Sequence, residues 1–155
     1  MSSNLDGSTF SYSPKLDDIT EKLIYVLFVI YHNMISKTQI LMFKKSADNI
    51  FREKDYTSAT ILYFKTWFAV QDFFLLKEIG QSPKDHSERF RLLEKNYQEE
   101  YKELDKEFST YRDTYSKIVD KETCERIKNI VENEIINKSI IKKDKGTSQK
   151  DGSNN

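Results

Sequence analysis

Two histidines and one cysteine are the side chains of this chain best suited to acid–base or nucleophilic chemistry. His32 and His86 lie far apart, and neither belongs to a His-x-x-x-His pair that could bind a metal. His86 follows Asp85 near the start of an expected helix, where it could act as a general acid or base, cap the helix or lie at the surface. Cys124 falls in the first turn of another expected helix, where the helix dipole can lower the pKa of a thiol. Because no base or second cysteine accompanies it, we expect Cys124 to be an inert helix residue.

Phosphate-loop and metal-cluster motifs are missing from the sequence. Gly80 is the only glycine between Gly7 and Gly146, so no glycine-rich phosphate loop exists. The single cysteine excludes an internal disulfide and a cysteine-rich zinc site, and it fits a reducing compartment. The formal net charge is zero, so any nucleic-acid surface would have to be a local patch. We expect a cytoplasmic protein without metal or cofactor.

The stretch from Asp55 to Gly80 is the element around which the other helices must be arranged. It contains the only tryptophan, Trp67, and carries apolar side chains on three helical faces. Only a helix surrounded by partners has this pattern, so we expect Trp67 to be largely buried. Gly80 indicates the end of this helix, and Ser82-Pro83 predicts a new helix with Pro83 at its first position.

The run from Leu23 to Tyr31, LIYVLFVIY, is the most apolar part of the chain. A membrane span needs about 20 apolar residues, and the polar residues from His32 to Lys37 interrupt this run early. A secretory signal would need a basic region before it, where this chain is acidic. A strand fits the composition, but no partner strand is visible. We therefore expect a core or dimer-contact helix, with His32 as a polar interruption on a mostly buried helix, and no membrane partner.

The remaining patterns are helical. Residues Ile40–Phe51 have amphipathic spacing, and Asp120 is the expected N-cap of a last helix. Apolar residues from Phe90 to Ile118 alternate steps of three and four, which indicates one long helix or two with a break near Asn96. Core packing is favoured over base stacking for the tyrosines of this seam, which are Tyr97, Tyr101, Tyr111 and Tyr115.

Together these elements predict an all-α fold, an antiparallel helical bundle of about five helices. The scarcity of turn residues, with two prolines and four glycines, supports this class. We expect a disordered leader over residues 1–13, a single helical domain over residues 14–138 and a disordered basic tail over residues 139–155.

Three motifs in order resemble those of the HEPN domain family. They are Asp55-Tyr56-x-x-Ala59, the loop Gly80-Gln81-Ser82-Pro83-Lys84-Asp85-His86-Ser87, and Arg112. The likeness covers about residues 40–137. It implies an antiparallel bundle that forms a homodimer and brings the arginine sites of two subunits into one cleft.

Many HEPN proteins are metal-independent RNases, and others are small partners of minimal nucleotidyltransferases in toxin–antitoxin pairs. In the RNases an arginine holds the scissile phosphate while a histidine transfers protons. With four, five or six residues after Arg112, the partner position falls on Lys117, Ile118 or Val119, so the histidine is missing. Tyr115 is a poor base, because a phenol has a pKa near 10. This departure favours binding over catalysis.

The resemblance thus implies a dimeric binding protein that holds a nucleotide or RNA phosphate. Its expected binding residues are Arg112, Tyr115, Lys117 and His86. Its expected protein partner is a nucleotidyltransferase-type protein in a toxin–antitoxin-like system. A non-catalytic dimeric scaffold is the second interpretation, and a weak metal-independent endoribonuclease toxin with Arg112 as its catalytic residue is the third.

Overall fold

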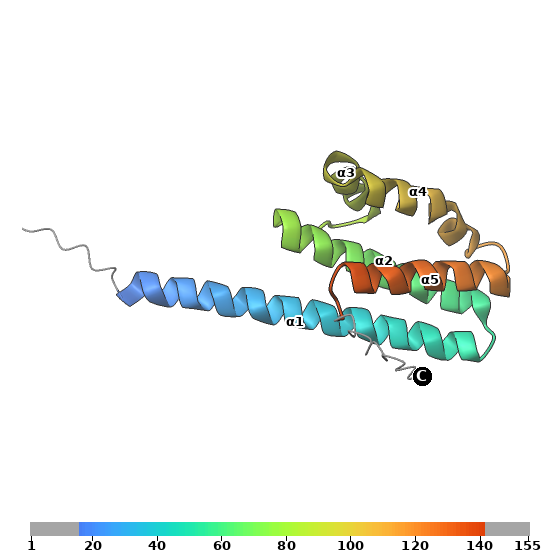
Figure 1. Cartoon of the computed structure of the whole chain (residues 1–155), viewed down its shortest axis with the longest axis horizontal. Helices are drawn as coiled ribbons and strands as arrows, with labels where there is room; N and C mark the ends of the chain where they lie inside the picture. The colour runs from blue at the N-terminus through green and yellow to red at the C-terminus, as the bar shows by residue number, and fades with distance from the viewer. Residues whose placement is uncertain (1–15, 142–155) are drawn as a thin grey trace, which may run out of the picture. The chain divides into compact units, whose positions relative to one another are not determined.

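The computed structural model describes residues 16–141, which form five helices and no strand (Figure 1). The helices are α1 (Leu16–Arg52), α2 (Tyr56–Ile79), α3 (His86–Asn96), α4 (Gln98–Asp113) and α5 (Lys121–Asn137). The predicted all-α fold of five helices is confirmed. The expected leader and the tail beyond residue 141 lie outside the described residues. The chain divides into two units, one up to Met34 and one from Ile35 onward.

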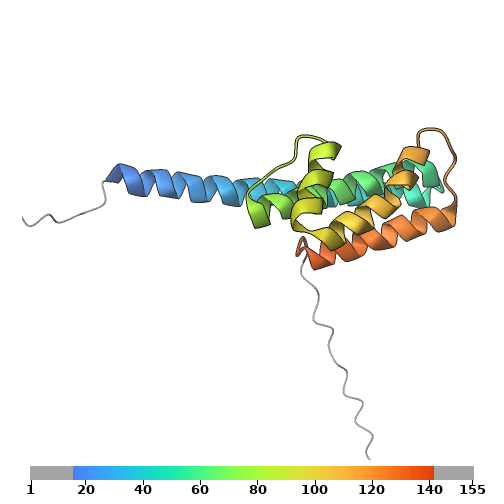
Figure 2. The same ribbon diagram turned by 90° about the horizontal axis from the view of Figure 1, so that it is seen from above.

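Helix α2 is the centre of the second unit, as its apolar faces predict. It packs against α5, α3 and α4, which surround it in Figures 1 and 2. Trp67 is completely buried, and Ile40 and Ala47 from the second half of α1 belong to the same core. These partners remove the apolar faces of α2 from water on several sides, as a helix that is apolar almost all round requires.

Helices α2 and α5 begin at a side-chain cap, and α2 ends at a backbone cap. The Asp55 carboxylate accepts a hydrogen bond from the Ser58 amide at 3.0 Å, and the Asp120 carboxylate accepts one from the Thr123 amide at 2.7 Å. Gly80 has φ of 68°, and its amide donates to the Leu76 carbonyl at 3.0 Å. These contacts confirm the expected stop at Gly80 and the expected cap at Asp120.

The start of α3 differs from the prediction, because Asp85 and not Pro83 sets it. The Asp85 carboxylate accepts from the Glu88 amide at 2.8 Å, and the Glu88 carboxylate accepts from the Lys84 amide at 2.9 Å. This reciprocal pair satisfies two amide donors at the helix start, which a proline at the first position does not do. The apolar seam that begins at Phe90 lies on two helices and not one, since Tyr97, at φ −143°, separates α3 from α4.

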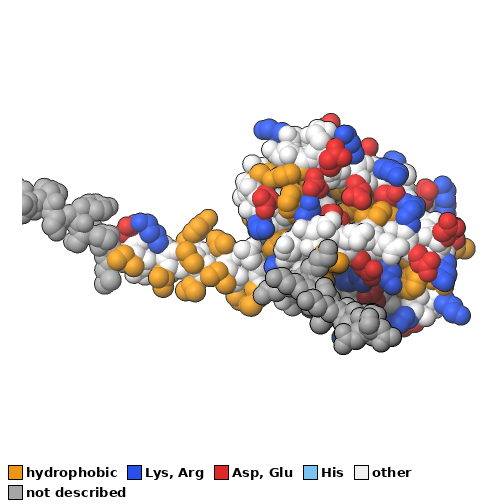
Figure 3. All heavy atoms as spheres, in the orientation of Figure 1, with side chains coloured by type: hydrophobic (Ala, Val, Ile, Leu, Met, Phe, Trp, Pro, Cys, Tyr) orange, Lys and Arg blue, Asp and Glu red, His pale blue; other side chains and the backbone are white. Residues whose placement is uncertain are grey.

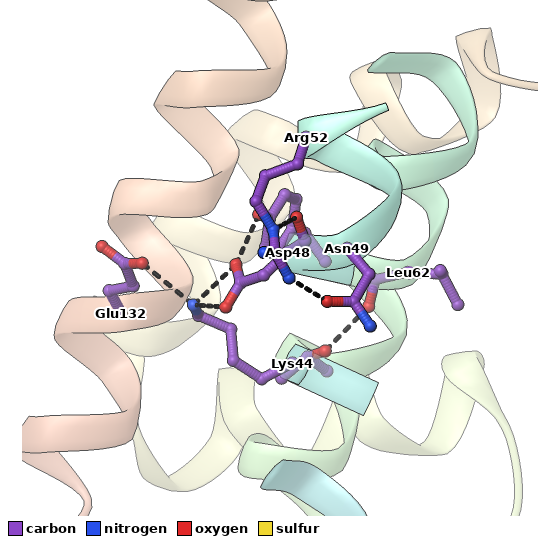
Figure 4. A network of polar contacts seen from close by, with 8 residues as sticks. Lys44, Asp48, Asn49, Arg52, Leu62 and Glu132 are labelled. Atoms are coloured by element: carbon purple, nitrogen blue, oxygen red, sulfur yellow. Dashed lines mark hydrogen bonds and ion pairs between the residues drawn. The ribbon is translucent and has the colours of Figure 1, made fainter. Parts of the chain in front are cut away.

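A polar network connects α1 to α5 across the second unit (Figure 4). The Lys44 ammonium lies 2.6 Å from the Asp48 carboxylate and 2.9 Å from the Glu132 carboxylate of α5. The Tyr63 hydroxyl donates to Asp48 at 2.7 Å, so a buried phenol of α2 joins the same network. Burial and the Asp48 carboxylate both raise the pKa of Tyr63, which keeps this donor protonated.

The aromatic seam ends earlier than its spacing predicts. Tyr97, Tyr101 and Tyr111 are half-buried against the core, as expected. Tyr115 is 73% exposed and Ile118 is 95% exposed, so for these two residues the prediction of core packing is wrong. Because α4 ends at Asp113, steps of three and four no longer place later residues on a common face.

The apolar run of α1 is the largest departure from the sequence analysis. Every residue from Leu23 to Tyr31 is exposed, so the expected burial in a core is wrong for the described chain, while the dimer contact remains a prediction. His32 is exposed as well, with its ring 6.0 Å from that of Phe28. Among residues 16–141, α1 is the one helix long and apolar enough to cross a membrane by length and composition.

Candidate functional site

Four helices of the second unit enclose a hollow of about 610 Å³. This volume lies within the usual range of small-ligand sites. The residues that line the hollow are Gln39 and Phe43 from α1, Ile61, Lys65, Phe68, Ala69 and Asp72 from α2, His86 and Arg89 from α3, and Tyr111 from α4. The hollow therefore combines apolar and aromatic walls with four ionisable side chains besides one tyrosine.

Arg89 is held rigidly at one side of the hollow. Its Nε and Nη2 donate to the two carboxylate oxygens of Asp72 at 2.6 and 2.7 Å, which is a bidentate pair between α3 and α2. Its guanidinium also lies 4.9 Å from the centre of the Phe68 ring. With only 8% of its side chain exposed, Arg89 needs this carboxylate to balance its charge.

His86 is fixed in one protonation state by the same arginine. The Nη1 of Arg89 lies 2.8 Å from His86 Nδ1, and because a guanidinium only donates, Nδ1 must accept. His86 is thus neutral, with its proton on Nε2. Burial and the positive charge of Arg89 lower the pKa of His86 from its ordinary value of 6.5. In this arrangement Nδ1 is not free to act as a base, whereas Nε2–H can donate to a ligand.

Aromatic rings surround His86 and extend the site toward the end of α4. The His86 ring lies 4.5 Å from Phe68 and 5.7 Å from both Phe108 and Tyr111. The Tyr111 hydroxyl lies 2.9 Å from that of Tyr115. Burial and this hydrogen bond raise the pKa of Tyr111 to about 12, so the hydroxyl stays protonated near neutral pH and can donate.

Lys65 is the second cation of the hollow and the more accessible one. Its ammonium lies over the Phe43 ring at 4.6 Å from the ring centre, and its side chain is exposed. The lining holds two cations, Lys65 and Arg89, and one carboxylate, Asp72, with His86 neutral. The hollow thus has a surplus of one positive charge, which favours an anionic ligand.

The structure unites only part of the residue set predicted from the sequence. His86 and Tyr115 meet through Tyr111, as the preceding contacts show. Arg112 instead lies over the Phe108 ring at 5.9 Å, and Lys117 forms an exposed ion pair at 3.0 Å with Asp113. Neither Arg112 nor Lys117 is among the residues that line the hollow.

Sequence reasoning missed the three charged residues that line the hollow, which are Lys65, Asp72 and Arg89. Two signals could have found them. Lys65 and Asp72 are charged residues inside the most apolar helix of the second unit, where a charge calls for a partner. Arg89 follows His86 by three positions, a spacing that places both on one helical face.

Cys124 is completely buried in the core, and burial raises the pKa of its thiol. The lowering that its helix position could produce is therefore outweighed, and the thiol lies away from solvent. Among residues 16–141, no three His, Cys, Asp or Glu side chains are grouped so that they could hold a metal ion.

The lowered pKa of His86 predicts a pH dependence of stability. Because the unfolded chain binds this proton more readily than the folded one, the free energy of unfolding should fall as the pH drops below 6.5. A His86→Asn variant keeps an acceptor for Arg89 but cannot titrate, so its stability should fall less over the same range. Urea unfolding at several pH values between neutrality and the onset of carboxylate titration measures both slopes. Parallel curves for the two proteins would contradict the assignment.

Comparisons with known proteins add no relative to this picture. No family model matches the chain, and neither a curated protein nor a solved structure gives a significant match.

Proposed function

We propose that the second unit is a binding module for a phosphate-bearing nucleotide, free or within RNA, and that the hollow beside His86 and Arg89 is its site. The observation that carries this proposal is the combination of donors and charge in one hollow. Lys65 supplies an accessible cation, His86 an Nε2–H donor and Tyr111 a hydroxyl donor. The half-buried rings of Phe43 and Tyr111 in the lining offer surfaces for a base.

Arg89 has a supporting role in this proposal. Each of its three nitrogens donates one hydrogen bond to Asp72 or His86, and only 8% of its side chain is exposed, so it has little access to a ligand. It therefore fixes the tautomer and position of His86, while Lys65 remains the cation that can meet a phosphate directly. The same arrangement disfavours an RNase mechanism with His86 as general base, because Nδ1 is occupied.

The order of motifs that resembles HEPN domains supports two further parts of the proposal. One is a homodimer, and the other is pairing with a nucleotidyltransferase-type protein in a toxin–antitoxin-like system. In such a dimer Arg112 and Lys117, which are exposed near the end of α4, would line a cleft between subunits. Tyr115 would then lie between that cleft and the hollow, through its bond to Tyr111.

The proposal predicts that Lys65→Ala weakens ATP binding by about 10-fold or more, since hydrogen bonds to charged groups typically contribute this much. Calorimetric titration of the full chain with ATP and with a short RNA, each at low and high salt, measures the effect. Lys45→Ala is the matched control, because Lys45 is an exposed lysine of α1 that does not line the hollow.

Arg112→Ala separates the two candidate sites. If it weakens binding while Lys65→Ala does not, the ligand occupies the cleft expected from the family resemblance and not the hollow. If wild type binds neither ATP nor RNA, the binding-module proposal fails.

A further inference from the structure

The first unit carries a surface that the proposed function does not use. The apolar segment, Leu23–Tyr31 of α1, consists of nine consecutive apolar or aromatic residues, each between 36% and 68% exposed. Figure 3 shows hydrophobic side chains, in orange, along this part of the chain. Nine successive residues at about 100° each point in every direction around a helix, so the segment has no polar stripe.

The absence of a polar stripe distinguishes two kinds of occupant. The same helix of a second copy would cover one stripe of the segment, about two in every seven residues, as in a coiled coil. The residues outside this stripe, or seam, would still face water. Every position of the apolar segment is apolar, so whichever positions formed the seam, apolar side chains outside it would still face water. A lipid phase, in contrast, contacts a helix on all sides. We infer that the apolar segment inserts into a lipid bilayer.

Its length and flanks determine how far it can enter. Nine residues span about 14 Å, less than half of the hydrocarbon thickness of about 30 Å. Glu21 and Lys22 precede the segment, and their charges must remain at the headgroups. Lys37, beyond its other end, is held by the second unit, where its ammonium donates to the Ser139 carbonyl at 2.8 Å. Beyond Lys37, Ile40 of α1 is buried in the core of the second unit and is not available to lipid. Both ends of the segment therefore stay at one membrane surface, so the segment lies along one leaflet below the headgroups and does not cross the bilayer.

The charges near the segment indicate what drives the binding. On its N-terminal side Asp17, Asp18 and Glu21 outnumber the two lysines Lys15 and Lys22, and Lys22 is paired with Asp18 at 3.0 Å. Without a basic face, the segment gains little from anionic lipids, so apolar burial must supply the affinity. Binding should then be similar on neutral and anionic vesicles and insensitive to salt. This inference is the alternative to the sequence-based expectation of no membrane partner, and the experiment below decides between them.

Flotation of the full chain with phosphatidylcholine vesicles, with and without phosphatidylserine, tests the inference. Wild type should float with both kinds of vesicle at low and at high salt. Phe28→Glu should reduce the partition coefficient by about 100-fold, because a carboxylate is strongly disfavoured in the hydrocarbon. Phe28→Leu should behave as wild type. Met42→Glu is the matched control, since Met42 and Phe28 are both 63% exposed on α1 and only Phe28 lies in the segment.

Light scattering in the absence of lipid gives the competing result. If wild type does not float and Phe28→Glu converts an oligomer to the 18.4 kDa monomer, a second copy covers the segment and the inference is overturned. The inference is also overturned if the wild type floats only with anionic vesicles, or if it is monomeric and does not float with either kind. ATP and RNA titrations report on the second unit, so the two proposals can fail independently.

Discussion

Replacing Trp67 with alanine is expected to lower the free energy of unfolding by about 3–5 kcal/mol, the range typical of large aromatic deletions in packed cores. Trp67 is completely buried in the middle of α2, and its ring lies 5.8 Å from that of Phe64. Domains of this size are stable by about 5–15 kcal/mol, so the loss removes a large part of the total. Urea unfolding followed by far-UV circular dichroism measures it, since the variant has no tryptophan to report by fluorescence.

Two further variants show whether this cost arises from lost packing. Trp67→Phe should cost less than half as much, because it retains a ring and removes an indole N–H that has no hydrogen-bond partner in the structure. Ile118→Ala, at a residue that is 95% exposed, should change stability by about 0.5 kcal/mol or less. A native fluorescence maximum typical of solvated tryptophan would show that α2 is not the centre of the bundle.

Replacing Arg89 with alanine is expected to cost about 2–3 kcal/mol, below the range for a fully buried pair because Asp72 is partly exposed. The cost comes mainly from the carboxylate of Asp72, which loses its bidentate partner. The Arg89→Met and Asp72→Leu double variant should recover most of the stability, since apolar replacement of both partners leaves no unpaired charge. Urea unfolding of the wild type, Arg89→Met, Asp72→Leu and the double variant completes the cycle.

The exposed pair between Lys102 and Glu99 is the comparison for this cycle. Its side chains are 65% and 86% exposed, so its removal should leave stability unchanged within error. If Arg89→Ala were equally silent, Arg89 would not be held by Asp72 in solution, and the fixed tautomer of His86 would lose its basis.

The features predictable from sequence are those that depend on neighbouring residues. The stop at Gly80, the cap at Asp120 and the burial of Trp67 follow from local chemistry or from the apolar faces of α2, and the structure has all three. The pairing of Arg89 with Asp72 joins two helices, and no periodicity indicates which charged residues meet across such an interface.

The prediction from apolar spacing was wrong for the residues that follow the end of α4. The seam placed Tyr115 on a buried face, but a face exists only while helical geometry continues, and α4 stops at Asp113. For the apolar run that begins at Leu23, the predicted burial in a core was wrong for a different reason. Composition shows that a segment avoids water, but it does not show whether protein or another phase replaces the water.

The pairing of α2 with α5 has a consequence for the order in which the chain can acquire its structure. Helix α2 is the most apolar helix of the second unit, and its most extensive contact is with α5, which begins at Lys121. During synthesis α2 is completed before α5 is made. The apolar faces of α2 that contact α5 therefore stay uncovered while the intervening residues are added. Nascent chains that stop before α5 therefore expose the surface of the second unit that is most prone to aggregation.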